Sequence, residues 1–154
     1  MTGFLKLWIG GEGLRLDEIT SILKIQPTYS YKKGDTHYDK YTKKTITYVE
    51  DCWMFAKKEI ETEQLEQEML RFIALFENNT EYIKSLAKKF KVFLWLSVYP
   101  ESEQYNVHLS HKVVEAIYKL GVPIDIEVAD LRAFYDGTYI YDTRMNTIDK
   151  RKDE

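Results

Sequence analysis

The chain has little that would allow covalent cross-linking or membrane insertion. Its 154 residues include a single cysteine, Cys52, so no internal disulfide can form and metal sites with four cysteines are excluded. No apolar run approaches the roughly 18 residues that a membrane-spanning helix needs. Residues 1–13 also lack the long apolar region and small-residue cleavage site of a signal peptide. We therefore expect a cytoplasmic protein without disulfides.

Net charge is also small. The formal charge of −3 gives no general preference for polyanions. Charge alternates in blocks: residues 28–48 sum to +3, with five lysines and two aspartates, whereas residues 50–68 sum to −5. Blocks of this kind usually lie on neighbouring surfaces that complement one another.

Apolar residues are plentiful, and their spacing predicts both strands and helices. Hydrophobic residues make up 44% of the chain, enough for one packed core. The predicted strands cover residues 4–9, 45–56 (with a bend at Glu50–Asp51), 92–99, 105–109 and 124–128. The most apolar of them, residues 92–99, is predicted to be a central strand covered on both faces. Three predicted helices have Asp17, Thr62 and Ser110 as their N-caps, and a further helix is predicted to start at Thr80.

The order of these elements predicts an α+β fold. We expect a mixed sheet with helices packed on one side, formed from two weakly related βα-type halves. A helical pair at residues 62–90 is expected to join the two halves. The chain is interpreted as a single α/β domain over residues 1–154 with its core at residues 3–128. A C-terminal hairpin is expected at residues 129–143, where Asp136–Gly137 favours a turn. The charged residues 146–154 are expected to fray.

A series of short motifs occurs in a characteristic order. They are the apolar strand ending in glycine, Asp17-Glu18-Ile19-Thr20, Pro27-Thr28, Gly34-Asp35, Trp53 and residues 121–128 (GVPIDIEV). Together they resemble the bacterial domain-of-unknown-function family 4279 over residues 3–128. The resemblance implies a compact bacterial α/β domain and, because the family has no assigned activity, it brings no catalytic residues. Residues 129–154 lie beyond it.

The histidines and the cysteine give little indication of chemistry. His108 and His111 are spaced to share a metal on a helix, but the Ser110 cap between them would point them apart, and no third ligand is near in sequence. Cys52, beside Trp53 in a strand, is interpreted as buried and structural rather than nucleophilic. We therefore predict no catalytic residue, no metal and no cofactor.

Two further patterns have a plain structural interpretation. The acidic residues Asp125, Glu127, Asp130 and Asp136 could pair in acid–base chemistry, but solvation of a strand face explains the first two. The glycines of residues 10–13 (GGEG) lack the lysine and hydroxyl residues of a phosphate loop, so they predict a turn.

The segment 27–48 is rich in tyrosine and lysine. Bases can stack on such tyrosines, but the absence of arginine and the acidic residues that follow make single-stranded nucleic acid the less favoured alternative. An exposed hairpin that contacts a protein is preferred. Its predicted partner-contact residues are Tyr29, Tyr31, Lys32, Lys33, Tyr38 and Tyr41.

These observations favour a non-catalytic protein-binding module, with immunity proteins as an analogy only. The alternative is a small-ligand binder or an enzyme with an unrecognised site. A deep apolar pocket with converging polar groups would support that alternative, whereas a flat aromatic patch would support the binding module. The sequence does not identify the partner or the oligomeric state.

Overall fold

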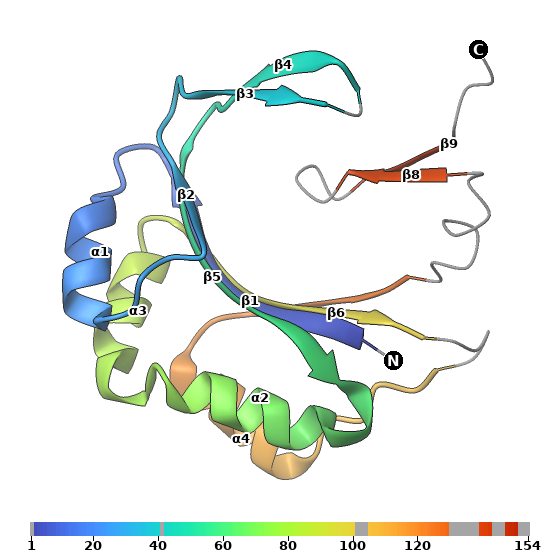
Figure 1. The fold of residues 1–154 in the computed structure, drawn as a ribbon. Helices are drawn as coiled ribbons and strands as arrows, with labels where there is room; N and C mark the ends of the chain where they lie inside the picture. Colours follow the sequence, from blue (N-terminus) through green and yellow to red (C-terminus); the bar gives the residue numbers. More distant parts are fainter. Residues whose placement is uncertain (1, 41, 101–104, 130–138, 143–146, 151–154) are drawn as a thin grey trace.

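A curved, mixed β-sheet forms the centre of the molecule (Figure 1). The structure, a computed structural model, describes residues 2–40, 42–100, 105–129, 139–142 and 147–150. Five strands form the sheet in the order β2–β5–β1–β6–β7. Their bounds are β1 (Thr2–Gly11), β2 (Tyr29–Tyr31), β5 (Asp51–Glu61), β6 (Lys91–Tyr99) and β7 (Ile124–Val128). Because β6 and β7 run parallel while the other neighbours run antiparallel, the sheet is mixed, as predicted.

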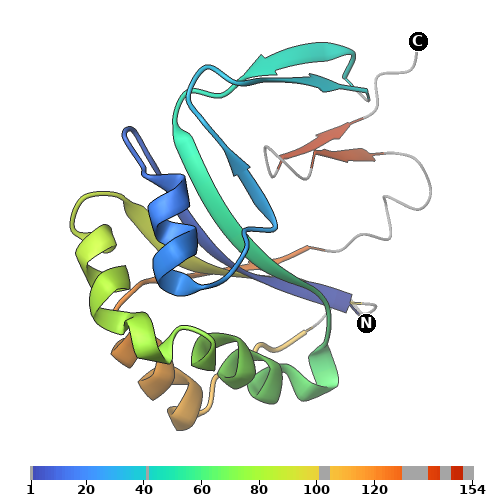
Figure 2. The same ribbon diagram turned by 60° about the vertical axis from the view of Figure 1, so that its left-hand side comes forward.

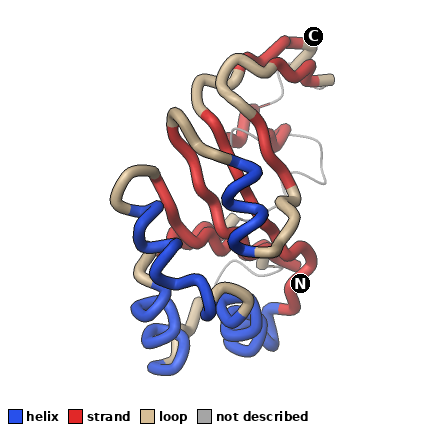
Figure 3. The backbone as a smooth tube through the Cα atoms, turned by 90° about the vertical axis from the view of Figure 1, so that its left-hand side faces the viewer, coloured by secondary structure: helices blue, strands red, loops and turns tan. Residues whose placement is uncertain are grey.

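The helices of the described residues lie on the convex side of this sheet (Figure 1). They are α1 (Leu16–Leu23), α2 (Leu65–Ala74), α3 (Thr80–Ala87) and α4 (His111–Leu120). Seen from the helical side, α1 crosses in front of the strands and the other helices gather at one end (Figure 3). Short 3-10 turns, η1 (Thr62–Gln64) and η2 (Glu77–Asn79), precede α2 and α3. The α+β fold with helices on one side is therefore confirmed.

The hydrophobic core lies between the sheet and the helices. Leu5, Leu7 and Ile9 of β1 alternate inward and are at most 1% exposed, because successive side chains of a strand point to opposite faces. The predicted apolar stripe of the second helical segment faces them and is buried: Leu65, Met69, Phe72, Ile73 and Phe76.

Helix α4 begins and ends as predicted. The Ser110 hydroxyl accepts a hydrogen bond from the Val113 amide, which otherwise has no partner within the helix. Gly121 ends the helix with a φ of 76°, a left-handed conformation that glycine adopts without strain.

Other details of the prediction are wrong. Helix α1 begins at Leu16, so Asp17 lies in its first turn and is not the cap. Helix α2 begins at Leu65, after the η1 turn, rather than at Thr62. By contrast, α3 begins at Thr80, as predicted. Residues 105–109 form no strand; Tyr105, Val107 and Leu109 instead pack against the core from an irregular segment.

The long strand predicted at residues 45–56 is divided between two sheets. A break at residues 48–50, next to the predicted bend, separates β4 (Lys44–Thr47) from β5. Strand β4 pairs only with β3 (Thr36–Asp39), and this hairpin projects away from the helices (Figure 2).

A second small hairpin lies near the end of the chain, formed by β8 (Tyr139–Asp142) and β9 (Thr147–Lys150). The predicted turn at Asp136–Gly137 lies outside the described residues. Strand β9 falls within the segment for which the sequence suggested fraying.

Candidate functional site: the open face of the sheet

The concave face of the sheet, opposite the helices, is here called the open face. Strand register places side chains of neighbouring strands in rows across it. One row contains Tyr29, Met54, Trp8 and Phe93, from β2, β5, β1 and β6 in that order. No described helix covers this face (Figure 1). Phe93 and Trp95 of β6 are only half-buried on this face, so the expectation that β6 is covered on both faces is wrong, although its interior position in the sheet is confirmed.

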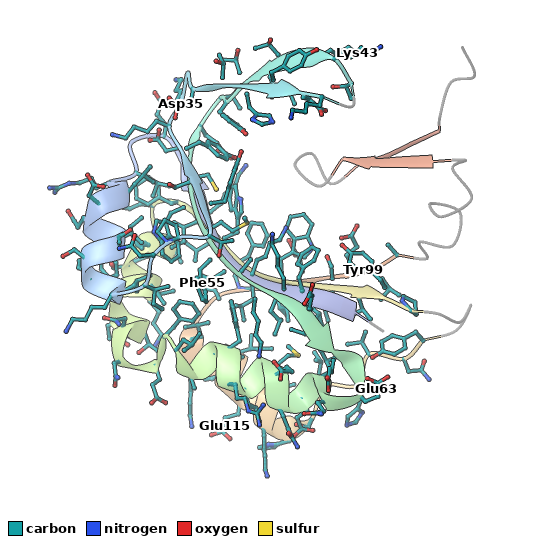
Figure 4. All side chains as sticks on the ribbon, in the orientation of Figure 1. Asp35, Lys43, Phe55, Glu63, Tyr99 and Glu115 are labelled. Carbon is teal, nitrogen blue, oxygen red and sulfur yellow. The ribbon has the colours of Figure 1, made fainter. Side chains whose placement is uncertain are left out.

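Five half-buried aromatic side chains of β1 and β6 form what we call the aromatic face: Phe4, Trp8, Phe93, Trp95 and Tyr99. Their ring centroids form a continuous chain. The distances are 5.9 Å from Tyr99 to Phe4 and 6.2 Å from Phe4 to Trp95. Trp95 is 6.2 Å from Phe93, which is 5.0 Å from Trp8. Tyr99 lies on the open side in Figure 4, whereas Phe55 lies on the helical side.

Gly10 allows the Trp8 indole to lie close to the strand. A Cβ atom at position 10 would come within 2.0 Å of the Trp8 ring. Any larger residue at position 10 would therefore displace Trp8 from its place beside Phe93.

Lys6 lies in the middle of the aromatic face. Its Nζ atom is 4.0 Å from the Phe4 ring centroid and 4.7 Å from that of Trp95, within the range of cation–π attraction. Burial lowers the pKa of this ammonium; the Lys58 charge lowers it further, while the Glu127 carboxylate opposes the shift. Lys6 and Lys58 form no ion pair with another described residue.

Polar groups border the aromatic face on the β7 side. The buried Ser97 hydroxyl donates a hydrogen bond of 2.8 Å to Glu127 Oε2. Asp125 is exposed, as expected for a solvated strand face, but Glu127 is half-buried. Solvation alone therefore does not explain Glu127.

Two of the predicted partner-contact residues lie on the open face. Tyr29 and Tyr31 of β2 join Tyr48 to form what we call the tyrosine cluster. The Tyr31 and Tyr48 rings stack with centroids 3.7 Å apart, and the hydroxyl groups of Tyr29 and Tyr48 are hydrogen-bonded. Met54 lies between this cluster and Trp8, so the cluster extends the aromatic face toward the β2 edge.

The remaining predicted residues are not gathered there. The Lys33 ammonium binds Glu12 at 2.9 Å, while Lys32 is exposed and its amide binds Asp35. Tyr38 is 56% exposed on the β3–β4 hairpin. Tyr41 lies outside the described residues.

Asp51 connects three segments at the start of β5. Its Oδ2 atom accepts hydrogen bonds from the amides of Gly13 (2.8 Å) and Leu14 (3.0 Å), and Oδ1 accepts one from Lys33 (2.8 Å). These bonds lower the pKa of the carboxyl, the Lys33 amide having the largest effect. Asp51 thus holds the glycine turn of residues 10–13 and the base of the β3–β4 hairpin against the sheet.

Cys52 is buried, as predicted, next to Tyr31. Burial raises the pKa of its thiol to about 12, so the thiol is neutral at pH 7 and weakly nucleophilic. His108 and His111 are both exposed, on either side of the Ser110 cap. Within the described ranges, no three His, Cys, Asp or Glu side chains come together as a metal site requires. Asp130 and Asp136 lie outside those ranges.

On the helical side, an open depression is lined by Glu77, Thr80, Lys84, Tyr118 and Lys119. It contains none of the predicted site residues. In the described part of the chain, no helix combines the length and apolar character needed to cross a bilayer.

Comparison with known families identifies the class of domain. Residues 2–131 match the model of a family described as "Domain of unknown function (DUF4279)". The chain therefore belongs to the DUF4279 family. Comparisons with curated proteins and with solved structures gave no match.

Sequence analysis missed the aromatic face. The signal is present in residues 4–9 (FLKLWI), where Phe4, Lys6 and Trp8 alternate with aliphatic residues, and again at Phe93 and Trp95. Both segments were interpreted as uniformly buried strands. An alternation of aromatic with aliphatic side chains instead indicates two chemically different faces.

Proposed function

We propose that this protein is a non-catalytic module that binds another protein through its open face. The aromatic face, which the described helices leave uncovered, is the observation that supports the proposal. Tryptophan and tyrosine dominate the energetics of many interfaces because they bury a large area at low entropic cost. The tyrosine cluster enlarges the same surface toward the β2 edge.

In this proposal the sequence-predicted contacts form one end of the interface. Tyr29 and Tyr31 contact the partner beside the aromatic face, and Tyr38, Lys32 and Lys33 contact it from the adjoining hairpin segment. If the partner is a toxin, the module acts in the manner of an immunity protein. A toxin gene beside the gene for this chain would identify such a partner.

The proposal is tested by affinity capture from the source cells with matched variants. Trp8→Ala and Trp95→Ala remove aromatic area from the open face. Met54→Lys adds a charge to that face without removing an aromatic ring. Tyr118→Ala is the control, because Tyr118 is an aromatic residue 84% exposed on α4, on the opposite side.

We expect the wild-type protein and Tyr118→Ala to retain the same partner and the three open-face variants to lose it. Thermal unfolding first confirms that each variant is folded. Retention of that partner by all three folded open-face variants would refute the proposal.

A further inference from the structure

Lys6 and Lys58 are two neighbouring cations on the open face. Lys58 lies opposite Phe4, two residues along β5 from Ala56, which is the partner of Lys6. The two ammonium groups are close enough for Lys58 to lower the pKa of Lys6. Glu127 bonds to Ser97, and it forms no ion pair with Lys6 among the described contacts.

The neighbour of Lys6 on the β5 side is small. The residue opposite Lys6 on β5 is Ala56, whereas Trp95 lies opposite it on β6. A group that approaches Lys6 from the β5 side therefore meets a methyl side chain rather than a large one. An anion placed there would compensate a charge that burial has partly desolvated.

Strand β1 presents an alternating pattern on the open face. Phe4, Lys6 and Trp8 provide an aromatic ring, a cation and a second ring at a spacing of two residues. An extended chain has the same repeat, because every second side chain points to one side. The complementary segment therefore carries an apolar, an acidic and an apolar side chain at alternate positions.

We propose that Lys6 and Lys58 bind a carboxylate of an extended protein segment whose flanking apolar side chains pack on the aromatic face. This inference rests on the proposed function and specifies the chemistry of the partner. The bond is a charge-assisted hydrogen bond from the lysine ammonium to the carboxylate. The rings of Phe4 and Trp95 hold Lys6 in position, so little side-chain freedom is lost on binding.

The three tryptophans provide a direct readout. Trp8 and Trp95 lie on the open face, whereas Trp53 is fully buried on the helical side, where its indole nitrogen donates to Thr20 Oγ1 at 3.0 Å. In a ¹H–¹⁵N spectrum the indole signals of Trp8 and Trp95 report on the open face, and that of Trp53 is an internal control. The probe peptides are acetyl-Phe-Ser-Asp-Ser-Phe-amide and its counterpart with Asn in place of Asp.

We expect the Asp peptide to shift the Trp8 and Trp95 signals but not that of Trp53, and to bind about ten-fold more tightly than the Asn peptide, as a charge-assisted bond implies. The double variant Lys6→Met, Lys58→Met, which retains apolar stems of similar length, should abolish this preference. Lys6→Arg should retain it. Lys112→Met, on the exposed side of α4, should leave it unchanged.

Equal binding of the two peptides by the wild-type protein would refute the carboxylate site while leaving the proposed function intact. Absence of any shift with either peptide would also refute the carboxylate site. An Asp preference that persists in the double variant Lys6→Met, Lys58→Met would do the same. Failure of the proposed function itself is seen separately, in the capture experiment with the Trp8 and Trp95 variants.

Discussion

Asp51 is expected to contribute strongly to stability although it lies outside the hydrophobic core. Asp51→Ala would leave three amides without their partner, those of Gly13, Leu14 and Lys33. An unsatisfied buried donor costs about 1–3 kcal/mol. Only the Leu14 bond is fully buried, and the other two amides can regain water in part. We therefore expect the free energy of unfolding to fall by about 3 kcal/mol.

Asp51→Asn separates the charge from the shape of the side chain. The amide keeps one acceptor oxygen, so some of the bonds survive and the loss should be smaller, about 1–2 kcal/mol at pH 7. The pKa of Asp51 is lowered in the folded protein. Its contribution to stability is therefore fully present above the unfolded pKa of about 3.9 and is lost as the pH falls through the folded value.

The assay is chemical denaturation of the wild-type protein and both variants at pH 7 and at successively lower pH. The difference between the wild-type protein and Asp51→Asn should shrink as the solution is acidified below about pH 4. Asp125→Asn is the control, since Asp125 is exposed and should change stability little. An Asp51→Ala protein as stable as the wild type at pH 7 would refute this account of the residue.

Four further outcomes are expected. Leu94→Asp and Leu96→Asp, at positions at most 1% exposed, should each lower the free energy of unfolding by several kcal/mol. At least one of them should abolish cooperative unfolding. If both variants melt like the wild-type protein, β6 does not belong to the core. Replacing the lysines 32, 33, 40, 43 and 44 by Gln should leave the melting temperature nearly unchanged, because exposed charges contribute little. We expect the wild-type protein not to bind an oligonucleotide at physiological salt. This expectation would be contradicted if the wild-type protein retained an oligonucleotide in a salt-dependent way and the lysine variant did not. Cys52 should react with a thiol reagent only in denaturant, since its thiol is buried. Fast labelling of Cys52 in the native protein would contradict its burial.

Periodicity in the sequence was enough to predict most elements of the fold. The alternation in residues 124–128 predicted β7. The apolar stripe from Leu65 to Phe76 predicted which side of α2, and of the turn after it, is buried. Ser110 was predicted as a cap and is one, because its bond to Val113 is local. Such features depend on residues within one or two turns of each other, so a single sequence contains the necessary information.

The features that the sequence did not predict depend on distant parts of the chain. Asp51 binds the amides of Gly13 and Leu14, which are 38 and 37 residues away. The aromatic face becomes evident only when β1 and β6 are neighbours and Trp8 lies opposite Phe93. Residues 105–109 have a strand-like pattern but form no strand, and their apolar side chains pack against the core instead.

Hydroxyl-radical footprinting of the tryptophans tests most directly whether the open face is a binding surface. In the free protein, Trp8 and Trp95 should be oxidised and the fully buried Trp53 protected. When the captured partner is added, oxidation of Trp8 and Trp95 should fall while Trp53 stays unchanged. Protection of Trp8 and Trp95 already in the free protein, or oxidation that the bound partner does not reduce, would contradict the account.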